Sequence, residues 1–159
     1  MTFYDARLER SLILFVLSVM MIQESKNRIL LVEDDEDTRY ALGMLFEMEG
    51  FDVITAGDGE EAYSQAVIER PDLIVTDINM PKVDGLSLIK MIREDGRTDS
   101  IPIVAVSAID KDHLNQAKEL GAIAVAQKPI EYDQFLSLVA KVVSARRKRN
   151  RIERSRSYR

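Results

Sequence analysis

The chain carries the run DLIVTDINMPKVDG at residues 72–85. Its first half is apolar and ends on Asp77, and its second half is a loop that contains Pro81 and closes on Gly85. Open α/β sheets hold their ligands outside the carboxyl ends of the strands, so a carboxylate at such an end is placed to do chemistry. An aspartate at the end of a strand is by itself more often a helix cap or a turn former. Whether Asp77 is functional therefore depends on the other motifs of the chain.

Three other polar groups follow apolar runs in the same way. They are the acidic run EDDED at 33–37, Ser107-Ala108 and Lys128-Pro129. The carboxyl ends of parallel strands lie on one edge of a sheet. We therefore expect these groups to meet Asp77 in space.

From residue 28 onward, short β-rich runs alternate with helical periodicity, which is typical of βα units around a parallel sheet. The predicted strands lie near 28–32, 52–56, 72–76, 102–106 and 123–127. The predicted helices lie near 37–48, 59–69, 85–94, 111–120 and 131–148. The third and fourth strands are apolar throughout, as expected for central strands with helices on both faces.

Length and charge predict one domain with two extensions. The chain has 159 residues, enough for one ordinary core, and no Cys, which fits a reducing compartment; we expect a cytoplasmic protein. Residues 27–143 contain 11 Lys and Arg against 23 Asp and Glu, whereas residues 144–159 contain 8 against 1. We therefore expect an N-terminal extension at 1–26, a domain at 27–143 and a basic C-terminal tail at 144–159.

The apolar segment at 12–22 is too short to span a membrane. As a helix it would cover about 16 Å against roughly 30 Å of hydrocarbon. The flanking residues also fit a signal peptide poorly. We expect either a helix that packs on the domain or on a second subunit, or, with slight preference, a mis-assigned start, because Met20 or Met21 could begin translation.

If Glu33, Asp34 and Asp77 converge, their like charges repel by several kcal/mol at about 4 Å and an effective dielectric near 20. A divalent cation offsets this best, and a carboxylate-rich site without His or Cys favours Mg²⁺ or Mn²⁺. With Lys128 and Ser107 added, the same groups could handle phosphate. Asp77 would attack phosphorus, Lys128 would neutralise oxygens, and Ser107 would donate a hydrogen bond.

These motifs, in this order and spacing, resemble the receiver domain of two-component response regulators over roughly residues 27–143. The matching elements are Glu33-Asp34 as the acidic pair, Asp77 as the phosphoacceptor, Asp-x-x-Met-Pro-x-x-Asp-Gly at 77–85 as the loop, Ser107-Ala108 as the hydroxyl and small residue, and Lys128-Pro129 with its usually cis bond. The resemblance implies a flavodoxin-like, doubly wound sheet of five parallel strands in the order 2-1-3-4-5, with five helices.

The resemblance also implies a function and a ligand set. The metal would be held by Asp34, Asp77 and the backbone carbonyl of Asn79, with Glu33 acting through water. The phosphoryl donor would be a histidine kinase or phosphotransfer protein, and the domain would act by contact with another protein or as a shuttle in a phosphorelay. We expect a single-domain regulator rather than an enzyme, with only self-catalysed phosphoryl transfer and loss.

Two positions depart from the family pattern. Receivers usually carry Tyr or Phe three residues before the Lys, where this chain has Val125, and an aromatic often follows Lys-Pro, where this chain has Ile130. We therefore expect phosphorylation with a smaller or altered transmission of the signal.

Several alternatives stay open. The chain could be a phosphorylation-independent receiver-like interaction module, or a Mg²⁺-dependent phosphohydrolase that forms an aspartyl phosphate, which ranks lower because the nucleophile follows the third strand. A homodimer is possible. The basic tail could bind nucleic acid, but we favour a solvated extension of the last helix, whose positive charge suits a helix C-terminus.

Overall fold

The computed structural model describes residues 13–14, 26–108 and 111–157. Its centre is one sheet of five parallel strands in the order β2-β1-β3-β4-β5. The strands are β1 (Arg28–Val32), β2 (Asp52–Ala56), β3 (Leu73–Asp77), β4 (Ile103–Ser107) and β5 (Ala124–Gln127). The predicted strand order is confirmed.

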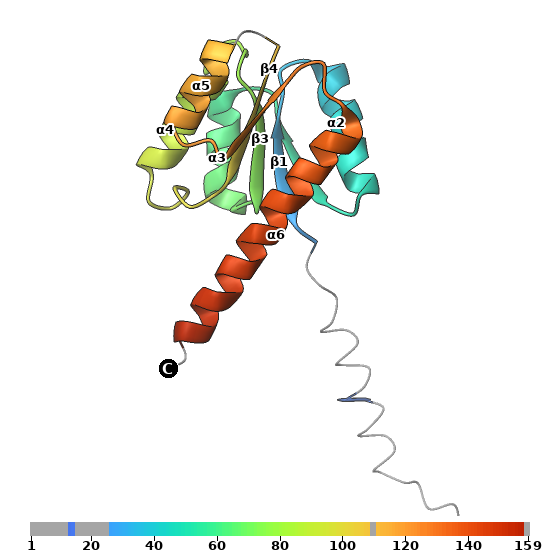
Figure 1. Ribbon diagram of the computed structural model, residues 1–159, viewed down its shortest axis with the longest axis vertical. Coiled ribbons are helices and arrows are strands. Elements are labelled where there is room, and N and C mark those ends of the chain that lie inside the picture. Colours follow the sequence, from blue (N-terminus) through green and yellow to red (C-terminus); the bar gives the residue numbers. More distant parts are fainter. Residues whose placement is uncertain (1–12, 15–25, 109–110, 158–159) are drawn as a thin grey trace, which may run out of the picture.

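Five helices alternate with the strands and cover the sheet on both faces (Figure 1). They are α2 (Glu36–Met48), α3 (Gly59–Glu69), α4 (Gly85–Glu94), α5 (Lys111–Glu119) and α6 (Tyr132–Ser157). One core cluster joins one face of the sheet to α3, α4 and α5, and a second joins the other face to α2 and α6. This three-layer, doubly wound arrangement confirms the predicted flavodoxin-like fold.

The burial of the strands follows their place in the sheet. Every residue of β3 and β4 is buried, whereas the edge strands β2 and β5 are largely half-buried. Since β3 lies between two strands and two helix layers, its carboxyl end is held rigidly. Asp77 is the last residue of that strand.

Aspartates begin three of the helices. Asp35 accepts a hydrogen bond from the backbone N–H of Thr38, Asp58 accepts two from the first turn of α3, and Asp84 accepts one from Ser87. Each satisfies N–H groups that have no partner inside the helix. Asp35 of the acidic run and Asp84 of the 77–85 loop therefore act as helix caps.

The last helix differs from the prediction. It continues to Ser157, nine residues beyond the expected end at 148, and extends past the sheet as a single rod (Figure 1). No Gly or Pro lies within this stretch to end it. The predicted extension at 1–26 lies almost wholly outside the described residues. Within the part of the chain that is described, no helix is long and apolar enough to cross a membrane.

Candidate functional site

The polar groups that follow β1, β3, β4 and β5 meet at one edge of the sheet. Asp77 pairs in register with Val106, and Ser107 pairs with Gln127, so Asp77, Ser107 and Lys128 end three neighbouring strands almost level. The Lys128 N–H donates to the Ser107 carbonyl at 2.8 Å. The parallel register thus brings together residues far apart in the chain, as predicted.

Three carboxylates form the centre of this edge. One oxygen each from Glu33, Asp34 and Asp77 lies within 4.8 Å of the other two. Glu33 is 4% exposed and Asp77 is 7% exposed, whereas Asp34 is open to solvent. Two buried carboxylates so close together need a positive partner, because like charges repel strongly where water is excluded.

Lys128 supplies positive charge to this cluster. Its ammonium donates to Glu33 Oε2 at 2.8 Å and also contacts Asp77 Oδ2. Burial acts to lower the pKa of Lys128, but the hydrogen bonds to Asp77 and Glu33 outweigh it, so its pKa is raised. Burial raises the pKa of Glu33 despite the opposing effect of the lysine. Lys128 therefore stays charged at neutral pH.

Asn79 and Ser107 complete the polar surface around Asp77. The Asn79 N–H donates to Asp77 Oδ1 at 2.9 Å, and its side-chain amide donates to Ser107 Oγ at 3.2 Å. Each carboxylate oxygen of Asp77 thus has a donor, one from its own loop and one from Lys128. These bonds fix the direction in which the carboxylate faces.

Sequence reasoning missed a residue that positions the acidic pair. The Arg39 guanidinium donates to the backbone carbonyl of Glu33 at 2.6 Å and to that of Asp34 at 3.3 Å. It ties the loop after β1 to the first turn of α2. The sequence does place this one cation two residues after the acidic run. It could not show that the guanidinium binds backbone carbonyls, because every residue has a carbonyl and no sequence motif marks one as a partner.

Gly85 fits the loop tightly against the strand that carries Asp77. A Cβ on Gly85 would collide with the carbonyl oxygen of Asp77 and lie 2.7 Å from the Ile78 Cα. Its N–H donates to the Ile78 carbonyl at 2.9 Å. The loop can fold back under Asp77 only because this position has no side chain.

The same loop is held from its far side by α3. Lys82 adopts a left-handed φ of 65° and its ammonium lies 2.7 Å from Asp58 Oδ2. The Gly59 N–H donates to the Val83 carbonyl at 3.1 Å. Lys82 and Asp84 therefore serve the turn, as expected, and do not reach the carboxylate cluster.

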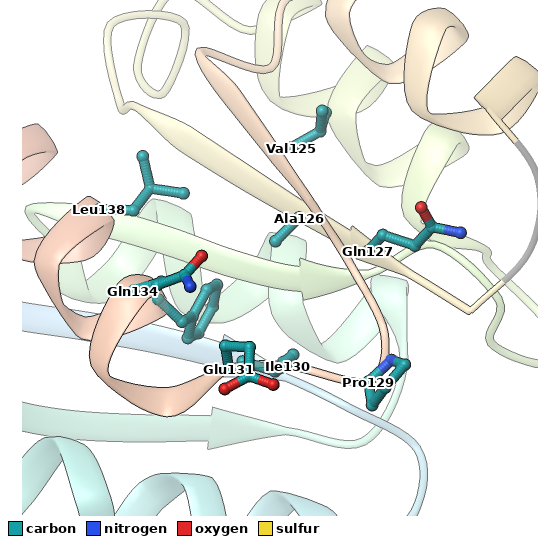
Figure 2. A pocket seen from close by; sticks show the side chains of 9 residues that line it. Val125, Ala126, Gln127, Pro129, Ile130, Glu131, Gln134 and Leu138 are labelled. Carbon is teal, nitrogen blue, oxygen red and sulfur yellow. The ribbon is translucent and has the colours of Figure 1, made fainter.

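The strand that precedes Lys128, β5, is less buried than β3. Val125 packs with the core cluster of α3, α4 and α5, whereas Ala126 points to the opposite side, toward α6 (Figure 2). There a hollow of about 290 Å³ lies between β5 and α6, lined partly by Ile130 and Leu138. Less core packing opposes a shift of β5 than of β3. The Lys128-Pro129 bond is cis, as the resemblance implies.

Chemically, the edge combines hard oxygen donors with a fixed cation. The oxygens of Glu33, Asp34 and Asp77 suit a hard divalent ion, which prefers carboxylate and water ligands. Lys128 and Ser107 lie where further negative oxygens beside Asp77 would be stabilised. The arrangement can hold a metal and stabilise phosphoryl oxygens beside one carboxylate.

Comparison with known proteins agrees with this geometry. Residues 29–140 match the family model described as the response regulator receiver domain. The alkaline phosphatase synthesis transcriptional regulatory protein PhoP of Bacillus subtilis is 41% identical over 103 residues, which cover 64% of this chain and 42% of PhoP. The polar-differentiation response regulator DivK of Brucella anthropi is 33% identical over 115 residues, which cover 70% of this chain and 91% of DivK.

Solved structures show the same fold. The chemotaxis protein CheY4 of Vibrio cholerae has a TM-score of 0.70 at 27% identity, over 74% of this chain and 99% of CheY4. A putative response regulator from Chloroflexus aurantiacus has a TM-score of 0.72 at 28% identity, and the match covers 76% of this chain and 99% of that protein. The chain spans about half the length of the transcriptional regulators it matches and most of DivK.

Proposed function

The chain belongs to the response regulator receiver domain family, and we propose that Asp77 is its phosphoacceptor. The donor is a phosphohistidine on a histidine kinase or a phosphotransfer protein. The phosphorylated domain signals through contact with a downstream protein. The near full-length match to DivK supports a regulator that acts through its receiver alone.

The observation that carries the proposal is the convergence on Asp77. The residue is 7% exposed, and its carboxylate contacts Lys128 and lies in one cluster with Glu33 and Asp34. An aspartate that only capped a turn would need neither a partly buried ammonium nor two further acids beside it. Buried charges this close cost several kcal/mol each in desolvation, so their retention indicates a functional site.

The proposed metal is Mg²⁺, with Mn²⁺ as a substitute. Asp34, Asp77 and the backbone carbonyl of Asn79 would hold it, and Glu33 would bind it through water. When bound, the ion supplies Lewis-acid stabilisation of phosphoryl oxygens. The dense group of hard oxygens fits this ion better than one that prefers thiolate or imidazole.

Phosphoryl transfer forms one bond and breaks another. An Asp77 oxygen forms the new P–O bond while the P–N bond of the phosphohistidine breaks, and the imidazole nitrogen takes up the electron pair. Lys128 stabilises negative oxygen on the phosphoryl group, and Ser107 Oγ donates a hydrogen bond to it. Asn79 and Arg39 act earlier, since they orient the carboxylates before the donor arrives.

The test is phosphorylation by a small donor. The purified chain is incubated with acetyl phosphate and Mg²⁺ and its intact mass is measured, with EDTA as the metal-free arm. We expect one added phosphoryl group that requires the metal and is absent in Asp77→Asn. Asp35→Asn is the matched control, because this exposed neighbour caps α2 and Asn caps equally well.

Three outcomes would contradict the proposal. Retained phosphorylation in Asp77→Asn would place the acceptor elsewhere. No phosphorylation in the folded native chain, with either acetyl phosphate or a phosphohistidine donor, would favour an interaction module that works without phosphate. Steady turnover of small phosphate esters would instead indicate a phosphohydrolase.

A further inference from the structure

The end of α6 is a rod of cationic side chains, here called the basic segment and defined as residues 146–156. It contains six Arg and one Lys against a single Glu. Arg147, Lys148 and Arg151 are exposed. At 1.5 Å per residue the segment is roughly 16 Å long, or about five base-pair steps.

The base of this rod is anchored to the domain. The guanidinium groups of Arg146 and Arg149 both donate to the Ser100 carbonyl, at 3.4 and 3.3 Å. Ser100 precedes β4, so this contact lies at the amino edge of the sheet, whereas Asp77 lies at the carboxyl edge. The segment is therefore held in a fixed direction, pointing away from the carboxylate cluster (Figure 1).

This placement separates two opposite charges. The domain at 27–143 carries a net charge of −12, from 11 cations and 23 anions, and residues 144–159 carry +7, from 8 and 1. A polyanion is repelled by the domain and attracted by the rod. Because the rod extends past the domain, a polyanion can reach the cations without approaching the acidic surface.

Beyond Arg149, the described side chains give the helix little apolar packing. Ile152 is the one large apolar residue in the basic segment, and it is 52% exposed. Arg147 and Arg151 are spaced i, i+4, where like charges repel. Short helices without packing are marginal in water, so a bound polyanion that neutralises the repulsion would stabilise this one.

The distribution of the cations selects the kind of polyanion. Successive helical residues are about 100° apart, so the exposed Arg147, Lys148 and Arg156 spread over about half of the circumference. A helix that lies on a membrane needs an apolar face, which this segment lacks. Cations on several sides of the helix can contact phosphates on both walls of a groove. The planar guanidinium of arginine can also donate two parallel hydrogen bonds to one phosphate.

We propose that the basic segment binds duplex DNA by entering the major groove and contacting the phosphates of both walls. The major groove of B-form DNA is about 12 Å wide and admits one α-helix, whereas that of A-form RNA is too deep and narrow. Binding rests on charge, because the cations of the segment neutralise phosphates whatever the base sequence between them. It is independent of Asp77.

The experiment measures binding of the unphosphorylated full chain to a labelled 30-base-pair random-sequence duplex by fluorescence anisotropy, as salt is raised from 50 to 200 mM. With about four phosphates contacted, we expect log K against log salt to have a slope near −3.6 and affinity to fall roughly 150-fold between 50 and 200 mM salt. The triple variant Arg147→Gln, Lys148→Gln, Arg151→Gln should lose at least about 10-fold in affinity at 50 mM salt and approach a slope of −1.

The matched control neutralises three cations on the domain, with Lys111→Gln, Lys118→Gln and Lys141→Gln. All three are exposed, so the net charge changes equally and the fold is preserved. The proposal is supported if this control binds the duplex with native affinity while the variant at Arg147, Lys148 and Arg151 binds it more weakly. Equal loss in both variants, or no binding by the native chain at 50 mM salt, overturns it.

Two further arms separate duplex DNA from other polyanions. A duplex RNA of the same length should bind at least about five-fold more weakly, since its major groove excludes the helix. Vesicles with one-third phosphatidylserine should bind more weakly than the duplex at equal salt. Equal or tighter binding to either one overturns insertion into the major groove.

Discussion

The ammonium of Lys128 contacts the carboxylate of Asp77, although the two residues are 51 positions apart in the chain. The same ammonium reaches Glu33 at 2.8 Å, so one side chain offsets the charge of two buried acids. The lysine follows the edge strand β5 and Asp77 ends the central strand β3. A shift of β5 would therefore be felt directly at the carboxylate.

Loss of this ammonium should slow phosphorylation more than it disturbs the fold. Lys128→Gln removes the charge that stabilises phosphoryl oxygens, and we expect the rate with acetyl phosphate to fall by about 10²- to 10³-fold. The chain has no Trp, so the rate is followed by intact mass rather than by indole fluorescence.

The matched control for this variant is Lys82→Gln. Lys82 lies on the neighbouring loop, but its side chain is 72% exposed and pairs with Asp58. Its loss should change the rate by less than about three-fold, as for an exposed ion pair of under 1 kcal/mol. Equal rates in the two variants would show that Lys128 has no special part in the reaction.

Gly85→Ala should destabilise the domain, because the new methyl would collide with the backbone of Asp77 and Ile78. We expect a loss of about 1–3 kcal/mol in the free energy of unfolding, measured by urea denaturation, with slower phosphorylation. Gly43→Ala is the control. It lies within α2 with nothing within 4 Å of an added Cβ, and should gain roughly 0.5–1 kcal/mol. Equal stability of both variants would contradict this account of the loop.

Asp95 should make stability depend on pH in the acid range. Hydrogen bonds from Arg97 and then from Tyr63 lower its pKa below the ordinary 3.8. A lowered pKa in the folded state gives stability that is fully present above that ordinary value and is lost as pH falls toward the folded pKa. The native chain should exceed Asp95→Asn in Tm at pH 7, and the gap should narrow below about pH 4. A difference in Tm between the two proteins that grows as the pH falls would contradict this prediction.

Signal transmission should be weak on the face formed by α5, β5 and α6. Val125 stands where receivers usually carry Tyr or Phe, and it is already packed against the core of α3, α4 and α5. With beryllium fluoride as a phosphoryl mimic, amide exchange should change around the 77–85 loop and little at β5. A large, localised protection change on that face, absent in Asp77→Asn, would disprove this expectation.

The parts of the fold that depend on local pattern could be predicted from the sequence. Apolar runs located the strands, and their carboxyl-end residues Asp77, Ser107 and Lys128 were assigned to one edge because parallel strands share it. Strand order came from the family resemblance rather than from the residues, since periodicity does not encode which strands are neighbours.

Features that depend on contact distant in the chain could not be predicted. Arg39 binds backbone carbonyls, and the need for Gly85 comes from the close approach of a strand that is not visible in the loop's own sequence. The predicted end of α6 at 148 is too early, whereas the favoured interpretation of the basic run as an extension of the last helix agrees with the structure. Residues 149–157 contain no Gly or Pro, which indicates that the helix can continue beyond residue 148.

The most direct measurement locates the phosphoryl group itself. The chain is phosphorylated with acetyl phosphate and Mg²⁺, reduced with borotritide, which converts an aspartyl phosphate to labelled homoserine, and then digested and mapped. The account predicts label at position 77, with none in Asp77→Asn. Label at Asp34 or at another carboxylate, or no label in a chain whose mass shows phosphorylation, would contradict it.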